Sequence, residues 1–211
     1  MRVAVHRGMS PAARAHPLLR WSRNAFFLAG ILILGYCGYV LVDAQIYQAL
    51  QARHFQQEMN DLRRANPGDQ KLLDLSFHPI PAGTLGKIEI PRIGLDAMIQ
   101  EGIDTRTLRR AVGHVPGTPL PGQQGNVAIA GHRDTFFRSL RNVRRNDEIT
   151  VTTLDGSYLY RVSSTEIVDP SDMKVLADSD ANLLTLVTCY PFYFVGPAPK
   201  RFVVHAQKIP L

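Results

Sequence analysis

Residues 25–42 form a run of eighteen residues that contains no charged side chain. A helix rises about 1.5 Å per residue, so this run is just long enough to cross the hydrocarbon core of a bilayer. Aromatic side chains that suit the membrane interfaces stand within and around the run, at Trp21, Tyr36, Tyr39 and Tyr47. The sequence therefore predicts one transmembrane helix, with separate compartments for the chain before and after it.

The positive charge of the chain is concentrated before this run. The whole sequence has 24 basic and 18 acidic side chains, a net charge of +6. Residues 1–23 hold five arginines and no acidic residue, namely Arg2, Arg7, Arg14, Arg20 and Arg23. The positive-inside rule assigns this basic tail, residues 1–24, to the cytoplasm and the rest of the chain to the outside. Because that remainder is about neutral, we expect no nucleic-acid partner.

The segment after the apolar run has one feature of a cleaved leader. Val42-Asp43-Ala44 is a small-residue pattern of the kind that signal peptidase accepts. The apolar run is nevertheless longer than the roughly seven to fifteen residues of an ordinary secretory signal. We therefore favour an uncleaved signal anchor.

Residues 43–83 are predicted to be an extracytoplasmic stalk helix followed by a linker. Apolar residues recur at helical spacing, at Ile46, Leu50, Phe55, Met59 and Leu62. The run Asn66-Pro67-Gly68 ends this pattern. A solvated stalk is favoured over the alternative, a helix that binds a partner.

Residues 84–211 are predicted to be one exported domain made of short strands. Residues 86–91 alternate between apolar and polar side chains, and Asp155-Gly156 is a hairpin signal. Asp104 is expected to cap a short helix. Regular short strands with few helices favour a closed or nearly closed β-barrel. No Cys/His pair has zinc spacing, so we expect no metal or other cofactor, although scattered acidic residues leave a calcium site open.

The exported domain contains a single cysteine, Cys189, because Cys37 lies within the apolar run. No intrachain disulfide is therefore expected. An unpaired cysteine outside the cell is a liability unless it has a use, although many buried cysteines are inert. Cys189 follows the apolar segment 182–187, and Tyr190-Pro191 ends the strand directly after it. The thiol is therefore expected at the edge of the sheet, where a reactive role is favoured.

Two further polar residues stand at predicted strand edges. His132 follows the apolar strand 126–130, and Arg201 opens the strand 201–206. A thiol, an imidazole and a guanidinium are the groups that a cysteine transpeptidase needs: a nucleophile, an acid–base and an oxyanion donor. The sequence predicts that Cys189, His132 and Arg201 form a catalytic site.

Two of these three assignments have a rival residue. Lys200 competes with Arg201 for the role of oxyanion donor. The planar guanidinium of arginine, with its several N–H donors, suits an oxyanion better than the compact ammonium group of lysine. His205 competes with His132, but it lies four residues past Arg201, about 13 Å along the strand, and is favoured as a core or barrel-lining residue. His114 follows the short helix and is kept as a candidate substrate contact.

The triplet His132-Arg133-Asp134 also imitates a protein-kinase catalytic loop. Ser139 stands where the metal-binding Asn belongs, and no glycine-rich phosphate loop precedes the triplet. The kinase interpretation is therefore rejected.

The three polar residues stand within motifs of a known family. The run Thr185-Leu186-Val187-Thr188-Cys189, with Gly131-His132 upstream and Arg201 on a strand downstream, resembles the sortase family over roughly residues 83–211. The resemblance implies the eight-stranded sortase β-barrel, which spacing alone does not select. Tyr190-Pro191-Phe192 and the compact size are similar to class D sortases.

The resemblance also implies a reaction and its setting. Cys189 attacks an LPxTG-like sorting signal, His132 serves as acid and base, Arg201 stabilises the oxyanion, and Thr188 orients the substrate or the thiol. An amine of the cell wall or of another protein then takes the protein from the thioacyl enzyme. The expected location is the bacterial cytoplasmic membrane, with the catalytic domain outside. The alternatives are a cysteine protease of the same fold and a non-catalytic scaffold domain.

Overall fold

The computed structural model describes residues 15–64, 83–194 and 196–210. Most of the predicted basic tail, residues 1–14, and most of the predicted linker, residues 65–82, lie outside the described residues. The chain divides into two compact units, the first ending at Asp43 and the second beginning at Ala44.

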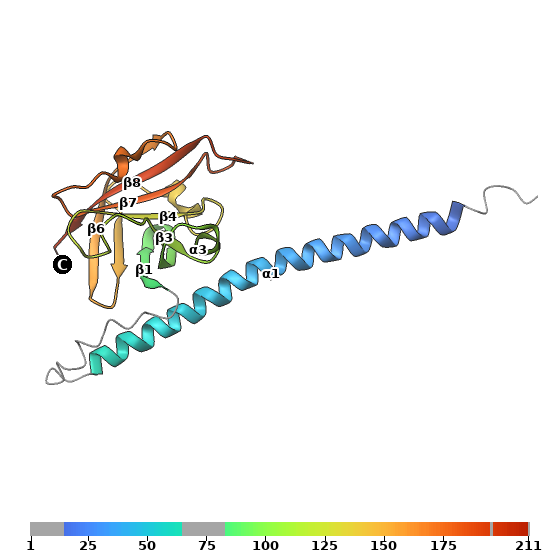
Figure 1. The fold of residues 1–211 in the computed structure, drawn as a ribbon, viewed down its shortest axis with the longest axis horizontal. Coiled ribbons are helices and arrows are strands. Elements are labelled where there is room, and N and C mark those ends of the chain that lie inside the picture. Colours follow the sequence, from blue (N-terminus) through green and yellow to red (C-terminus); the bar gives the residue numbers. More distant parts are fainter. Residues whose placement is uncertain (1–14, 65–82, 195, 211) are drawn as a thin grey trace, which may run out of the picture. The chain divides into compact units, whose positions relative to one another are not determined.

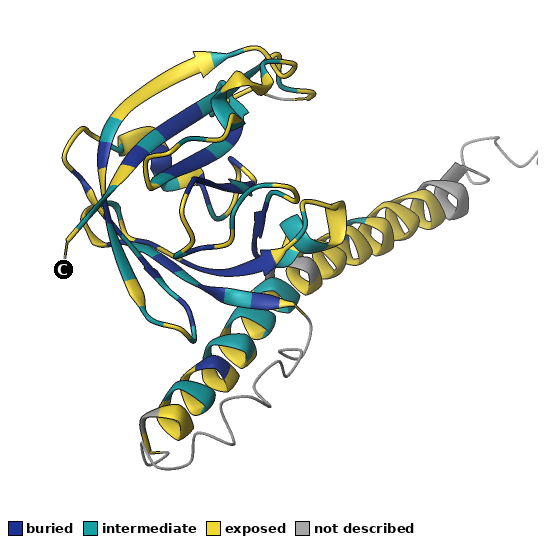
Figure 2. Cartoon of the chain, turned by 60° about the vertical axis from the view of Figure 1, so that its left-hand side comes forward, coloured by how far each residue is buried: buried dark blue, intermediate teal, exposed yellow. Residues whose placement is uncertain are grey.

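The first element is a helix of 50 residues, α1 (Ala15–Arg64). It contains a segment long and apolar enough to cross a membrane, judged by length and composition, within Arg20–Leu62. The large apolar side chains of this segment are exposed, among them Phe26, Ile31 and Leu34. Most of this part of the helix is coloured as exposed in Figure 2. Apolar side chains around the whole circumference suit a helix that is buried or surrounded by lipid.

Eight strands of the second unit close into a barrel (Figure 1). They are β1 (Thr84–Ile90), β2 (Leu95–Glu101), β3 (Val112–His114), β4 (Asn126–Gly131), β5 (Glu148–Thr152), β6 (Ser157–Val168), β7 (Leu183–Tyr190) and β8 (Lys200–Ile209). The order around the barrel is β1-β2-β3-β4-β7-β8-β6-β5. The predicted eight-stranded barrel is therefore confirmed, and closure leaves no unpaired sheet edge.

Alternation along the strands fills the barrel interior. Side chains of one parity point inward and form a single buried core, which includes Ile88, Leu95, Ile99, Val127, Ile129, Ile149, Val151, Val162, Leu184, Leu186, Val204 and Ala206. The opposite parity forms the outer face of the wall. Away from the register shifts at Thr84/Gly86 and Val162/Ser164, a strand residue can therefore be assigned to one side by counting from a core neighbour.

Short helices and one hairpin connect the strands. Asp104 caps α3 (Thr105–Arg110) as expected, because its Oδ1 accepts from the Arg106 and Thr107 N–H groups at 2.8 and 3.2 Å. The Asp155-Gly156 turn joins β5 to β6, also as expected. The 3-10 turns are η2 (Pro91–Ile93), η3 (Arg138–Asn142) and η4 (Met173–Leu176).

The second half of α1 contacts the barrel instead of standing free in solvent. Gln48 accepts from the Met98 N–H at 2.9 Å and donates to the Arg110 carbonyl at 2.5 Å. The Thr84 hydroxyl donates to Gln51 at 2.9 Å, and Phe55 is buried. The sequence favoured a solvated stalk because helical spacing reveals an apolar face but not the surface that covers it.

Candidate active site

Three neighbouring strands, β4, β7 and β8, bring the predicted catalytic residues into one row. β4 and β7 are parallel with Gly131 opposite Thr188, so His132 leaves β4 beside Cys189. β7 and β8 are antiparallel, and Cys189 is paired with Arg201. Neighbouring strands are about 4.8 Å apart, so the row His132–Cys189–Arg201 spans about 10 Å at the backbone.

The row lies on the outer face of the barrel wall. On β7, Leu184 and Leu186 belong to the core, so Cys189 has the outward parity. On β8, Val204 and Ala206 belong to the core, and Arg201 has the outward parity too. His132 is exposed, whereas Cys189 and Arg201 are half-buried. This combination leaves the three groups open to a substrate that lies along the outside of β4 and β7.

Local packing fixes how His132 leaves the sheet. The His132 carbonyl accepts from the Phe137 N–H at 3.1 Å, which closes the turn that follows β4. The Phe137 ring is fully buried and packs on Gly131, where an added Cβ would come within 2.7 Å of the ring. Glycine at position 131 therefore provides the space that the turn requires.

Thr188 ties the two parallel strands together next to the thiol. Its hydroxyl is buried and donates to the Gly131 carbonyl at 2.7 Å. The bond joins the residue before Cys189 to the residue before His132. Thr188 has the inward parity, so this contact holds the two strand ends in register.

The imidazole of His132 and the thiol of Cys189 form no hydrogen bond with any residue that the structure describes. The guanidinium of Arg201 donates only through Nη1, to the carbonyls of Ala198 at 3.3 Å and Lys200 at 3.0 Å. Within the same described part of the chain, its Nε and Nη2 hydrogens have no acceptor. Lys200, the rival cation, is paired with Asp169 at 2.7 Å.

Comparison with known proteins identifies the family. Residues 88–209 match the family model described as the sortase domain. Sortase D of Bacillus subtilis (strain 168) is 32% identical over 188 residues, which cover 86% of this chain and 94% of that protein. The chain belongs to the sortase family. Members of this family are cysteine transpeptidases of the cell envelope.

Solved sortase structures share the fold. A Clostridium perfringens sortase D5 transpeptidase superposes with a TM-score of 0.59 and 27% identity, covering 79% of this chain and 98% of that one. Sortase C-1 of Actinomyces oris gives a TM-score of 0.57 with 29% identity, covering 70% and 84%. These relatives confirm the predicted resemblance to sortases, and sortase D of Bacillus subtilis and the Clostridium perfringens sortase D5 agree with the predicted class D.

A buried arginine holds the loop that follows the cysteine strand of this sortase. Arg133 is 6% exposed, and its guanidinium donates to the carbonyls of Pro191 at 2.9 Å, Phe194 at 2.6 Å and Gly196 at 3.1 Å. Its nearest carboxylate, Asp134, lies at 3.6 Å and is 73% exposed. Since Arg133 adjoins His132, one side chain connects the histidine turn to the β7–β8 loop. No local sequence pattern around Arg133 indicates this role.

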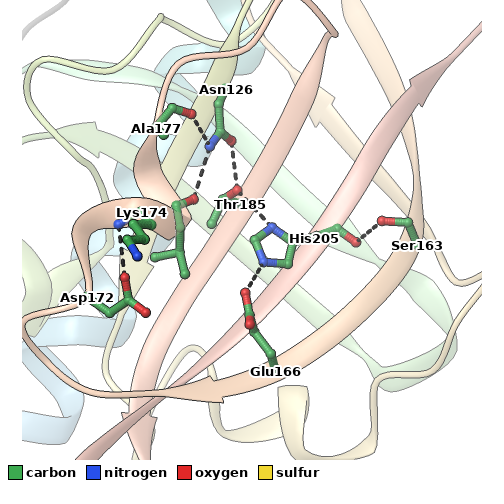
Figure 3. Close-up of polar contacts among 9 residues, drawn as sticks. Asn126, Ser163, Glu166, Asp172, Lys174, Ala177, Thr185 and His205 are labelled. Carbon is green, nitrogen blue, oxygen red and sulfur yellow. Dashed lines mark hydrogen bonds and ion pairs between the residues drawn. The ribbon is translucent and has the colours of Figure 1, made fainter.

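A second polar cluster lies near the other end of β7 on the same outer face (Figure 3). The Thr185 hydroxyl donates to Asn126 Oδ1 at 2.7 Å and lies 3.4 Å from His205 Nδ1, while His205 Nε2 lies 2.7 Å from Glu166. The Asn126 amide donates to the carbonyls of Val175 and Ala177, both at 3.1 Å. The cluster therefore anchors the β6–β7 connection, which contains η4, to the wall.

His114 is separate from both clusters. It is 2% exposed; Nδ1 lies 2.7 Å from Glu101, and Nε2 lies 2.9 Å from the Pro119 carbonyl. Both ring nitrogens are occupied inside the fold, so the expectation of a substrate contact is not carried forward. The described residues also contain no group of three metal-ligating side chains.

Proposed function

We propose that this chain is a membrane-anchored sortase that cleaves an LPxTG-like sorting signal and transfers the protein to an amine. The observation that supports the proposal is the row of His132, Cys189 and Arg201 on three adjacent strands. A thiol, an imidazole and a guanidinium in one row provide a nucleophile, an acid–base and an oxyanion donor within reach of one scissile bond.

The first half-reaction forms a thioester. The Cys189 sulfur, as the thiolate, attacks the carbonyl carbon of the scissile peptide bond. Arg201 donates to the oxyanion through hydrogens that have no acceptor among the described residues. The C–N bond then breaks, and His132, as the imidazolium, gives a proton to the departing amine.

The second half-reaction reverses these roles. Neutral His132 takes a proton from the incoming amine, whose nitrogen attacks the thioester carbonyl. The C–S bond breaks, Cys189 leaves as the thiolate, and a new amide bond remains. The exposure of His132 also lets water act as the acceptor, in which case the product is a hydrolysed protein.

The proposal includes the predicted location. The apolar segment 25–42 of α1 would anchor the chain in the cytoplasmic membrane, and the barrel would lie outside. Residues 1–24 would remain in the cytoplasm because of their arginines. The donor would be a protein with a C-terminal sorting signal, and the acceptor an amine of the cell wall or of another protein.

Mass spectrometry of the full chain with an LPxTG-type peptide library and a small amine tests the proposal. We expect a thioacyl adduct on Cys189 and products that depend on the amine, and neither with Cys189→Ala. Hydrolysed product alone would indicate a protease. Absence of any adduct, together with a Cys189 thiol that resists alkylation, would indicate a scaffold domain.

A further inference from the structure

A pocket lined by arginines lies beside the segment that carries His132. Its lining residues are Arg92, Ile93, Arg141, Asn142, Val143 and Arg144, and its volume is about 460 Å³. The pocket is open to solvent, so it suits one charged group of a larger molecule better than a whole enclosed ligand. Three of its six lining residues are arginines and none is acidic, so its charge favours an anion.

The charge of this pocket is only partly balanced. Arg92 forms a bidentate pair with Asp147 and donates to the Asn142 carbonyl at 2.6 Å. This guanidinium holds the pKa of Asp147 below its usual range, so the pair stays ionised and neutral overall. Arg141 and Arg144 have no carboxylate within ion-pair distance among the residues described, although the charge of Arg144 also acts on Asp147. The lining as a whole therefore has a net positive charge.

The surrounding sequence increases this charge. Four arginines fall within eight residues, at Arg138, Arg141, Arg144 and Arg145, and all four are exposed. Every cation in this stretch is arginine, whose planar fork matches a carboxylate or a phosphate with two parallel hydrogen bonds. Exposed arginines are common as solubilising charges, but these adjoin a concave pocket and the candidate active site.

The pocket is linked to the candidate site by contact and by the chain. The Arg141 guanidinium lies 5.5 Å from the ring centroid of Tyr193, which is 78% exposed and four residues past Cys189. The arginine segment itself begins at the turn that follows His132. A molecule held in the pocket would therefore lie next to the β7–β8 loop, on the side of the row that carries His132.

We propose that the arginine pocket binds an anionic group, a carboxylate or a phosphate, of the amine acceptor. This inference rests on the proposed function, because only a transpeptidase has an acceptor. The pocket would select acceptors whose amine is attached to a negatively charged molecule, and it would place that amine near the Cys189 thioester. Cleavage of the donor peptide would not depend on it.

The test compares matched acceptors with the full chain in nanodiscs of neutral lipid. Gly-Gly-Glu is compared with Gly-Gly-Gln amide, and Gly-Gly-phosphoserine amide with Gly-Gly-Ser amide, since each pair has the same reactive amine. The wild type should prefer the anionic member of at least one pair, and the two pairs distinguish carboxylate from phosphate. Arg144→Gln should reduce that preference about fivefold, as expected for an exposed charge-assisted contact.

The control variant is Arg161→Gln, which removes an exposed arginine on β6 that is paired with Glu148. It should leave the preference unchanged, and donor hydrolysis without acceptor should be unchanged in both variants. Equal rates for charged and neutral acceptors in the wild type, or full preference in Arg144→Gln, would overturn the inference.

A second readout does not need activity. Phenylglyoxal modifies exposed arginines, and mass spectrometry reports the extent at Arg141 and Arg144. Inorganic phosphate or Gly-Gly-Glu should protect these two residues more than Arg161. Protection only by phosphatidylglycerol vesicles would instead assign the surface to lipid and overturn the inference. Protection without cleavage of any donor would refute the proposed function while leaving the anion site intact.

Discussion

The two polar clusters on the outer face of β7 differ in how their side chains are bonded. At the carboxyl end of the strand, His132 and Cys189 form no side-chain hydrogen bond to a described residue. Near the amino end, Thr185, His205 and Asn126 are bonded to one another, to Glu166 and to the η4 backbone (Figure 3).

This difference in hydrogen bonding distinguishes side chains that are candidates for catalysis from side chains that stabilise the fold. Cys189 and Arg201 are half-buried, and a half-buried polar group with unused hydrogen-bonding capacity costs free energy, so it persists where a substrate supplies the missing partner. A fully bonded network rigidifies the elements that it joins. The first cluster is therefore our candidate for catalysis, and the second holds the β6–β7 connection in place.

The two histidines on this face provide the largest expected difference. His132→Ala should lower kcat by about 10²- to 10⁴-fold, the range for loss of a general acid–base. His205→Ala should lower kcat less than about tenfold and reduce the Tm, because it removes a structural contact. Rates of amide formation and thermal unfolding measure both effects. Equal losses of kcat would remove the distinction between the clusters.

Replacing the guanidinium tests the third member of the row. Arg201→Lys keeps the charge but not the planar fork, and we expect kcat to fall about 10²-fold through weaker oxyanion stabilisation. Lys200→Ala is the matched control, since Lys200 is paired with Asp169 and should change kcat little. Steady-state kinetics with one donor peptide decide the outcome. A fully active Arg201→Lys would reduce Arg201 to a simple positive charge.

Replacing Arg133 tests whether a buried side chain outside the row of candidate catalytic residues keeps that row in place. Arg133→Met keeps the apolar volume but frees three carbonyls of the β7–β8 loop. We expect a loss of about 1–3 kcal/mol in the free energy of unfolding and a moderate fall in kcat. Arg133→Lys should rescue only partly, because one ammonium group cannot reproduce the guanidinium geometry. Hydrogen exchange of residues 190–199 should rise in both variants, and unchanged exchange would contradict the role.

Replacing Asn126 tests whether the second cluster anchors the β6–β7 connection. Asn126→Asp keeps an acceptor for Thr185 but loses both N–H bonds to Val175 and Ala177. We expect KM for the donor peptide to rise several-fold with a smaller change in kcat, because the β6–β7 connection loses its anchor. Exchange of backbone hydrogens in residues 171–178 should increase at the same time. A fall in kcat with unchanged KM would instead place Asn126 among the chemical groups.

Removing the Arg92–Asp147 ion pair, which lies outside both clusters, should have the smallest effect, a change in how stability depends on pH. Hydrogen bonding to Arg92 lowers the pKa of Asp147, so its contribution to stability is present above about pH 4 and lost as the pH falls through the lowered pKa. We expect this contribution to be small, because solvent screens the charge of the exposed Arg92 side chain. Thermal unfolding between pH 6 and pH 3 should show a smaller acid-induced loss in Asp147→Asn. An identical slope would show that the pair contributes nothing to acid stability.

The sequence predicted the barrel and the row because both depend on local patterns. The apolar segment before Cys189 and the strand after Arg201 have clear strand signals, and the motif around Cys189 selects the family fold. The loop anchors were not predictable, because Arg133 contacts carbonyls 58 to 63 residues away and Asn126 contacts carbonyls 49 and 51 residues away. A polar residue that opens an apolar strand, as Asn126 does, was the one available signal.

Contacts between residues that are distant in the chain also explain why the sequence did not predict the surroundings of His114 and of the second half of α1. A histidine in a loop after a short helix is compatible with a substrate contact, and only the fold shows that Glu101 and Pro119 occupy both nitrogens. From the sequence alone, Gln48 and Gln51 are expected to be solvated, but in the fold they are hydrogen-bonded to residues of β2 and β1. In each case the partner is distant in the chain, so residue type alone does not identify it.

The parallel pairing of β4 with β7 has a consequence for protein engineering. A deletion of one residue within β7 would rotate Cys189 from the outer face into the barrel interior, since side chains alternate along a strand. Alternation does not limit the length of the connections that precede β7 and follow it, provided that the carbonyls bonded by Asn126 and Arg133 stay in place. Libraries that vary those connections while conserving residues 183–190 are therefore the practical route to altered donor selectivity in this scaffold.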